Sequence, residues 1–174
     1  DIAPTQNWKK KCLNKAKIDV PKEVTLTPIN FNKEALKDVL QKAGYDHQKK
    51  TLFIWEGVSY YLEAESVDAT LDFVSSSSHP ESVVAFDYVA PLTSENENAF
   101  GVKKFFESMK KEHEDEALVF AIDKGKIESF LEERELKIIE HLDNEEIEQK
   151  FLMKEDSLLG QMTAHFRFVS ASPK

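Results

Sequence analysis

The segment 55–62, Trp-Glu-Gly-Val-Ser-Tyr-Tyr-Leu, holds the side chains that are best suited to chemistry. It follows an almost continuous apolar run, 51–55, which is typical of a strand buried on both faces of a parallel sheet. Glu56 therefore ends a strand, and Gly57 lets the backbone turn or lets a ligand approach. Ligands of open α/β sheets bind outside the carboxyl ends of the strands, so Glu56 lies where a site is expected. A carboxylate that only caps the following turn is the alternative interpretation.

Polar groups also end two other predicted strands. Asn30 follows the alternating segment 24–29, where its amide could hydrogen-bond a purine edge or, more commonly, its own backbone. Asp87 lies near the end of the strand 82–89 among apolar neighbours, which favours a structural hydrogen bond over a substrate contact. Of the paired Tyr60 and Tyr61, we expect one in the core and the other lining a pocket.

The sequence contains no motif for a metal site or an activated nucleophile. Neither Gly-x-Ser-x-Gly nor a Gly-rich phosphate loop occurs, because the five glycines are far apart. Cys12 lies on the apolar side of a predicted helix, which favours packing over catalysis. The five histidines show no metal-ligand spacing and are interpreted as surface or core residues: His47, His79, His113, His141 and His165.

Hydrophobic periodicity predicts alternating helices and strands. The first helix would bury a stripe of Trp8, Cys12 and Ala16, and Asn32 would cap the second. The pattern predicts an α/β fold with a largely parallel sheet and one domain over residues 1–174. The predicted helices are 5–17, 32–43, 64–77, 99–114, 126–134 and 144–153, and the predicted strands are 24–29, 51–55, 82–89, 136–142 and 164–170.

Composition excludes several classes of protein. With 23 Lys and Arg against 32 Asp and Glu, the net charge of −9 argues against a general binder of nucleic-acid backbones. One cysteine excludes an internal disulfide framework. The apolar runs are too short for a membrane span, and no charged-then-apolar leader opens the sequence. We therefore expect a cytoplasmic protein without a membrane or nucleic-acid partner.

The block 51–74, TLFIWEGVSYYLEAESVDATLDFV, followed by VVAFDYV at 83–89, resembles the leucine carboxyl methyltransferase family, S-adenosylmethionine-dependent O-methyltransferases with polyketide-type bacterial and archaeal members. The opening DIAPTQNWKKKCL and the segment 101–142 are similar to the same family, so the resemblance covers nearly the whole chain. It implies a class I methyltransferase-like, Rossmann-like three-layer fold with helices on both faces of the sheet. The implied reaction is methyl transfer from S-adenosyl-L-methionine to a carboxylate or hydroxyl of a small-molecule or other acceptor that the sequence does not identify.

The resemblance also implies roles for individual residues. Asp1 corresponds to the acid that binds the cofactor ribose, Asn30 and Phe31 to the pair beside the adenine, and Glu56 to a residue that borders the cofactor. Asn30 departs from the family's Asp and keeps hydrogen bonding without the charge. Tyr60 and Tyr61 are assigned to the acceptor pocket. A methyl transfer that depends on alignment needs no strong base for a carboxylate acceptor, and no catalytic residue is assigned.

The family's first two strands, its Gly-rich donor loop and an upstream Arg have no counterpart in this sequence, whose first residue is Asp1. The family's strand order is 3-2-1-4-5-7-6, so the segment 24–29 would lose its neighbour. We expect it to pair with 51–56 or to exchange across a homodimer through exposed strand edges. The alternatives to an N-terminally truncated methyltransferase are a non-catalytic self-associating remnant and a half-enzyme that needs a separate N-terminal piece.

Overall fold

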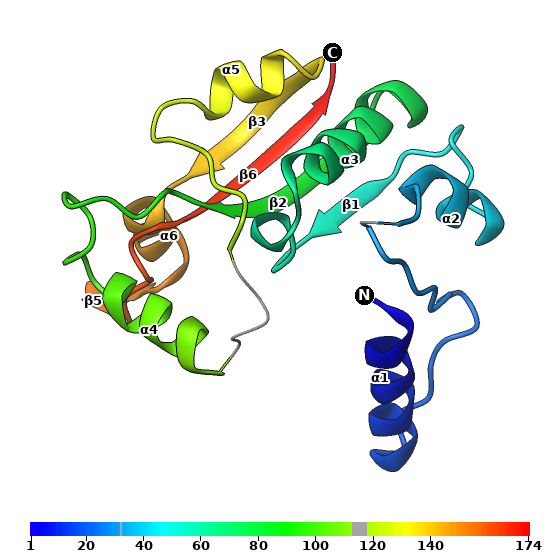
Figure 1. The fold of residues 1–174 in the computed structure, drawn as a ribbon, viewed down its shortest axis with the longest axis horizontal. Coiled ribbons are helices and arrows are strands. Elements are labelled where there is room, and N and C mark those ends of the chain that lie inside the picture. The colour runs from blue at the N-terminus through cyan, green and yellow to red at the C-terminus, as the bar shows by residue number, and fades with distance from the viewer. Residues whose placement is uncertain (32, 113–117) are drawn as a thin grey trace. The chain divides into compact units, whose positions relative to one another are not determined.

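The computed structural model describes residues 1–31, 33–112 and 118–174 and divides the chain into two compact units, 1–47 and 48–174 (Figure 1). Each unit is described by itself, and the single-domain interpretation stays a prediction. Unit 1 contains α1 (Ala3–Lys15) and α2 (Leu36–Lys42). Unit 2 contains β1 (Leu52–Trp55), η1 (Ser59–Tyr61), α3 (Ala64–Ser77), β2 (Val83–Val89), α4 (Val102–Glu112), α5 (Ile127–Glu132), β3 (Leu136–Leu142), α6 (Asn144–Phe151), β4 (Met153–Lys154), β5 (Ser157–Leu158) and β6 (Phe166–Pro173).

Both predicted helices of unit 1 form, but the predicted buried stripe of the first is wrong. Trp8 is 67% exposed and Cys12 is exposed, whereas Gln6 is the buried residue of α1. One apolar residue per turn makes too narrow a stripe to require a partner surface. The second helix buries Val39 as expected and starts at Leu36, while the predicted cap Asn32 lies outside the described residues.

The predicted strand 24–29 is also wrong. Within the described residues this segment belongs to no strand, and the ladders of β1 include β2 alone, so its predicted pairing with 51–56 inside the chain does not form. Its one long-range backbone hydrogen bond that the structure gives runs from the Ile29 N–H to the Asp1 carbonyl oxygen, at 2.8 Å. Alternation of apolar and polar residues predicts that one face of a segment is apolar, but it does not predict a neighbouring strand, which a ladder requires. Exchange across a homodimer stays a prediction.

Unit 2 is built on a four-stranded sheet in the order β1-β2-β6-β3. β1 and β2 are parallel, whereas β6 runs antiparallel to both β2 and β3. The prediction of a largely parallel sheet therefore holds for strand direction in β1, β2 and β3, but two of the three ladders are antiparallel. The carboxyl ends of β1 and β2 and the start of β6 meet at one edge of the sheet, since Val89 pairs with Phe166.

α3 and α5 supply the apolar core of unit 2. Phe53 of β1 contacts Phe73 of α3 with its ring edge, at 6.1 Å between centroids. The largest fully buried side chains include Leu71 of α3 and Leu131 of α5. Amphipathic helices with one apolar stripe are stabilised by covering an apolar sheet face in this way. Helix 64–77 has the bounds that the sequence predicted.

The opposite face of β1 contradicts the prediction of a strand buried on both faces. Successive side chains of a strand point to opposite faces, so Leu52 and Ile54 point away from Phe53. Leu52 is 62% exposed and Ile54 is 72% exposed. The continuous apolar run identified the strand correctly but not what covers its second face.

We predict that Leu71→Ala lowers the free energy of unfolding of unit 2 by about 2–5 kcal/mol, because it opens a cavity in the core. Urea titration followed by Trp55 fluorescence in a Trp8→Phe background measures this unit. Leu159→Ala is the matched control, since Leu159 is exposed and its truncation should change the free energy by less than about 0.5 kcal/mol. Equal effects of the two variants would contradict this core.

Candidate functional site

The buried carboxylate of Asp87 organises the carboxyl ends of β1 and β2. Its Oδ1 accepts a hydrogen bond from the Gly57 backbone N–H at 2.8 Å, and its Oδ2 accepts one from the Tyr60 hydroxyl at 3.3 Å. The Ser59 hydroxyl donates to the Asp87 carbonyl oxygen at 2.6 Å. One residue of β2 therefore holds three residues that follow β1. The sequence prediction of a structural hydrogen bond for Asp87 is confirmed.

Burial has the largest effect on the pKa values of Asp87 and Tyr60. Desolvation raises the pKa of Asp87 above its ordinary value, although the Gly57 and Tyr60 donors act to lower it. Desolvation, followed by the nearby Asp87 charge, raises the pKa of Tyr60 well above its ordinary value. Tyr60 thus stays protonated as a donor over the physiological range.

Glu56 emerges exposed from the turn that Asp87 holds. Gly57 has a φ of 70°, a conformation that side-chain-bearing residues rarely adopt, and this turn carries the chain from β1 into η1. Among the described residues the Glu56 carboxylate has no hydrogen-bond or ion-pair partner, so the capping alternative for Glu56 is not what the structure shows. The charge of Glu56 contributes to the raised pKa of both Asp87 and Tyr60.

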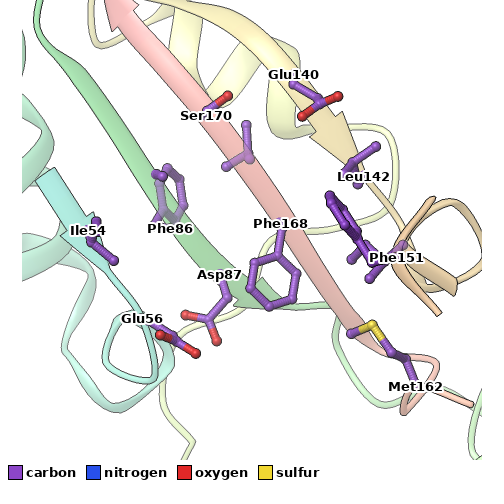
Figure 2. A pocket seen from close by; sticks show the side chains of 13 residues that line it. Ile54, Glu56, Phe86, Asp87, Glu140, Leu142, Phe151, Met162, Phe168 and Ser170 are labelled. Carbon is purple, nitrogen blue, oxygen red and sulfur yellow. The ribbon is translucent and has the colours of Figure 1, made fainter. Parts of the chain in front are cut away.

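A cavity of about 450 Å³ opens on the sheet face that carries Ile54, and Glu56 and Asp87 line it at the carboxyl ends of their strands (Figure 2). Phe168 of β6 lies beside Asp87, and Glu140 stands on β3 across the sheet. The lining is largely apolar, and its other members are Ala85, Phe86, Leu142, Ile147, Phe151, Met162, Val169 and Ser170. An exposed carboxylate beside an apolar wall suits a ligand that carries both a positive charge and an apolar ring.

Tyr60 and Tyr61 differ in burial, and the prediction that one of them lies in the core is confirmed for Tyr60. Tyr60 is buried and gives its hydroxyl to Asp87, so its contribution to a pocket is limited to its ring. Tyr61 is half-buried, and its ring is tilted against that of Tyr60 with 4.8 Å between the centroids. Its hydroxyl donates to the Met109 sulfur of α4 at 3.8 Å. The acceptor-pocket role of both residues stays a prediction.

The three remaining predicted site residues lie in unit 1. Asp1 is exposed, and its carbonyl oxygen accepts the Ile29 N–H, so Asp1 and Asn30 are brought near one another. The Asn30 backbone N–H donates to the Glu34 carboxylate at 3.0 Å, and Phe31 is half-buried. The structure therefore gathers Asp1, Asn30 and Phe31 within unit 1, whereas Glu56 belongs to unit 2.

Sequence reasoning gave no particular role to His165, which precedes β6. His165 is 1% exposed, and neither ring nitrogen has a hydrogen-bond partner within the part of the chain that the structure describes. Burial, helped by the charge of Arg167, lowers the pKa of His165 to about 4. The available signal was its position: a histidine directly before an apolar strand, β6, that begins at the edge where β1 and β2 end. His113 lies outside the described residues.

Comparison with known proteins shows which family the chain resembles. Residues 1–75 match the family model of leucine carboxyl methyltransferase. YktD of Bacillus subtilis (strain 168), named as an S-adenosyl-L-methionine-dependent methyltransferase, is 30% identical over 169 residues, which are 95% of this chain and 54% of YktD. The chain is therefore similar to the leucine carboxyl methyltransferase family. It spans about half the length of this relative.

A second relative, Rv0731c of Mycobacterium tuberculosis (strain H37Rv), is also named as an S-adenosyl-L-methionine-dependent methyltransferase. It is 40% identical over 58 residues, 33% of this chain and 18% of its own length. Both relatives are named as S-adenosyl-L-methionine-dependent methyltransferases, the kind of protein that the sequence predicted.

Solved structures confirm the predicted fold class. The mitomycin 7-O-methyltransferase MmcR matches with a TM-score of 0.57 at 11% identity, over all of this chain and 40% of its own. PKMT2 from Rickettsia typhi matches with a TM-score of 0.52 at 12% identity, over all of this chain and 43% of its own. The order β1-β2-β6-β3 corresponds to strands four, five, seven and six of the order expected from the family. In the described residues, no helix is long and apolar enough to cross a membrane.

We predict that the unfolding free energy of the chain contains a term from Asp87 that decreases as pH rises. A raised pKa means that the folded chain binds the proton more readily than the unfolded chain, so stability falls above the ordinary Asp pKa of about 3.9. Asp87→Asn cannot titrate but keeps an oxygen for the Gly57 N–H. Urea titrations between pH 3.5 and about 7 should therefore show the stability of this variant, relative to the unmodified chain, increasing with pH.

Tyr60→Phe is the informative companion, because it removes one donor that lowers the pKa of Asp87. The fall in stability should then extend to higher pH. A stability difference between Asp87→Asn and the unmodified chain that is constant with pH would contradict the assignment.

Proposed function

We propose that this chain is the part of an S-adenosylmethionine-dependent O-methyltransferase that carries strands four to seven of the fold, together with residues that contact the cofactor. The observation that carries the proposal is Glu56, which stands exposed at the carboxyl end of β1 with no partner for its carboxylate among the described residues, in a chain similar to this family. The position of Glu56 at a strand end and its negative charge both suit it to binding a cationic methyl donor.

The proposed roles follow from the chemistry of the residues. When bound, S-adenosylmethionine supplies an electrophilic methyl group on a sulfonium. Glu56 offers a carboxylate to the positive charge of the donor, while Asp87 fixes the turn on which Glu56 stands. From unit 1 we propose Asp1 for the ribose and Asn30 and Phe31 for the adenine. Such residues accelerate transfer by aligning donor and acceptor, without a strong base.

The proposed acceptor is a carboxylate or a hydroxyl. Tyr60 and Tyr61 of η1 supply two adjacent rings at the carboxyl end of β1, which suits them to the wall of an acceptor pocket. Tyr61 is the better candidate of the two, because the hydroxyl of Tyr60 is already bound to Asp87.

Titration calorimetry with S-adenosylhomocysteine tests the cofactor proposal directly. The proposal expects binding by this chain or by a version extended with its upstream coding sequence, and Glu56→Gln should weaken that binding at least about tenfold, or about 1.4 kcal/mol. Glu65→Gln is the matched control, since Glu65 is an exposed acid on the first turn of α3. Absence of binding by both lengths, or equal affinities of the two variants, would contradict the proposal.

A second proposal, self-association through the edge of β1, is supported by a separate observation. β1 is an edge strand of the sheet, and its exposed Leu52 and Ile54 stand on the face away from α3. Apolar edge strands readily pair with another chain, and a second copy of this chain offers the same edge.

Ile54→Lys tests this proposal, because a lysine on an edge strand opposes pairing. We predict a dimer in sedimentation velocity that Ile54→Lys converts to a monomer. Ile139→Lys on β3, the other edge strand, should leave the dimer intact, since Ile139 is likewise exposed. A monomeric unmodified chain at the highest soluble concentration, or dissociation by Ile139→Lys alone, would refute pairing through β1.

A further inference from the structure

The sheet face that carries Ile54 forms an apolar groove, which is the cavity of about 450 Å³ shown in Figure 2. Phe168 of β6 and Leu142 of β3 lie around it together with Ile54, and Phe151 of α6 borders it. Ile54 is 72% exposed and Phe151 is 61% exposed. Contiguous exposed apolar surface marks a site of interaction, because leaving it in water is unfavourable. We therefore expect the groove to receive an apolar partner.

Acidic side chains lie at two edges of this groove. Glu56 follows β1 and Glu140 stands on β3, and these are the two outer strands of the sheet. Within the described residues no lysine or arginine lines the groove. Lys150 forms an ion pair with Glu140, whereas the Glu56 carboxylate has no such partner there. The groove therefore favours a partner that is apolar and positively charged.

The dimensions of the sheet suit a helix as this partner. Neighbouring strands lie about 4.8 Å apart, so three spacings give about 14 Å between the outer strands, and a helix with its side chains is about 10–12 Å across. The same groove of a second copy is a poor partner, since it would bring the acids of both copies together, and like charges that face one another across an interface are unfavourable.

α1 is an exposed helix whose charge is opposite to that of the groove. Residues 2–18 contain five lysines and no acid, although the whole chain has a net charge of −9. Trp8 is 67% exposed. Lys11 and Lys15 are also exposed, and because they follow Trp8 by three and seven residues, the three side chains share one face of α1. This face thus offers an aromatic ring with two lysines beside it.

We propose that α1 of a second copy of this chain docks in the groove, with the Trp8 ring on its apolar floor and Lys11 and Lys15 toward its acidic edges. Pockets of about 300–1,000 Å³ hold drug-sized ligands, so this cavity has room for an indole ring. A tryptophan that fills a pocket at the centre of an interface is typical of a binding hot spot, and the opposite charges orient the two surfaces.

This contact goes beyond the proposed methyl transfer and does not depend on it. It also differs from pairing through the edge of β1, because edge pairing joins backbone groups and leaves the sheet face of Ile54 open. Trp8 takes part only in the docking contact, so its environment reports on that contact alone.

The test follows Trp8 fluorescence in a chain with Trp55→Phe, in which Trp8 is the one tryptophan that remains. This reporter chain is kept dilute. A second chain with Trp8→Ala and Trp55→Phe contains no tryptophan but has an intact groove, and it is titrated into the reporter chain. We expect the Trp8 emission to move to shorter wavelength and to saturate, because the indole leaves water for an apolar surface.

A substitution in the groove of the tryptophan-free chain locates the contact. Ser170→Arg places a bulky positive side chain in the groove and should weaken the binding at least about tenfold. Ser157→Arg is the matched control and should leave the affinity unchanged, because Ser157 is exposed on β5 and does not line the groove.

Charge reversal on α1 of the reporter chain tests the contribution of the lysines. Lys11→Glu combined with Lys15→Glu should also weaken the binding at least about tenfold, since it sets acids against the acidic edges of the groove. Lys103→Glu combined with Lys104→Glu is the matched control, because these two lysines are exposed on α4 and lie outside α1 and the groove. Circular dichroism checks the fold of each variant.

Four results would overturn the proposal. They are a Trp8 emission that the tryptophan-free chain does not change, equal effects of Ser170→Arg and Ser157→Arg, equal effects of the two charge reversals, and an emission that is already at short wavelength and independent of dilution. The last result would favour α1 in the groove of its own chain. A dimer in sedimentation velocity with an unchanged Trp8 signal would support pairing through β1 and refute docking of α1.

The unmodified chain provides a second measurement if Trp55→Phe misfolds. Its ¹⁵N spectrum contains two indole N–H resonances, and the loss of one in Trp8→Phe assigns that resonance to Trp8. The Trp8 resonance should shift as the concentration of the unmodified chain rises. A resonance that stays at one position over the whole soluble range would contradict docking by a second copy.

Discussion

The hydrogen bond from the Gly57 backbone N–H to the Asp87 carboxylate is the interaction on which the site depends. It joins the end of β1 to β2 beyond the last ladder pair of these strands, Trp55 with Phe86. The Tyr60 and Ser59 hydroxyls bind the same residue, so η1 is held against β2 as well. A buried carboxylate is stable only when its oxygens are satisfied, and these donors satisfy it. The consequence is a fixed turn that leaves Glu56 facing solvent.

The two neighbouring carboxylates, Asp87 and Glu56, have different roles in this arrangement. Asp87 is buried and serves the structure, whereas Glu56 is exposed and has no partner among the described side chains. Two acids of the same type thus acquire different roles from their surroundings. The position of Glu56 agrees with the proposed site, because open α/β sheets bind ligands outside the carboxyl ends of their parallel strands.

Local pattern was sufficient to predict most elements of unit 2. The periodicity of Val67, Leu71 and Val74 gave α3 its bounds, and the apolar run gave β1 and β2. Asp87 among apolar neighbours indicated a structural bond. The sequence did not predict the hairpin of β4 and β5, because each strand has only two residues. In addition, Glu155 and Asp156 in its turn adopt left-handed conformations, which residues other than glycine rarely adopt and which the sequence therefore does not indicate.

What the sequence could not predict is which surfaces meet. Ile54 belongs to an apolar run yet is exposed, and Trp8 belongs to an apolar stripe yet is exposed, since burial depends on partners far away in the chain. The segment 24–29 alternates like a strand but has no ladder in the described structure. For the same reason, sequence alone could not show that the ring nitrogens of His165 lack a hydrogen-bond partner among the described residues, since this depends on how α4 and β6 pack together.

Amide hydrogen exchange at Gly57, followed by NMR, tests the central claim most directly, namely that the Asp87 carboxylate holds the turn after β1. Gly57 is itself exposed, so protection of its amide must come from that hydrogen bond. The account predicts a protected Gly57 amide that loses its protection in Asp87→Ala and keeps it in Asp87→Asn. A Gly57 amide that exchanges at the rate of an unstructured peptide in the unmodified chain would contradict it.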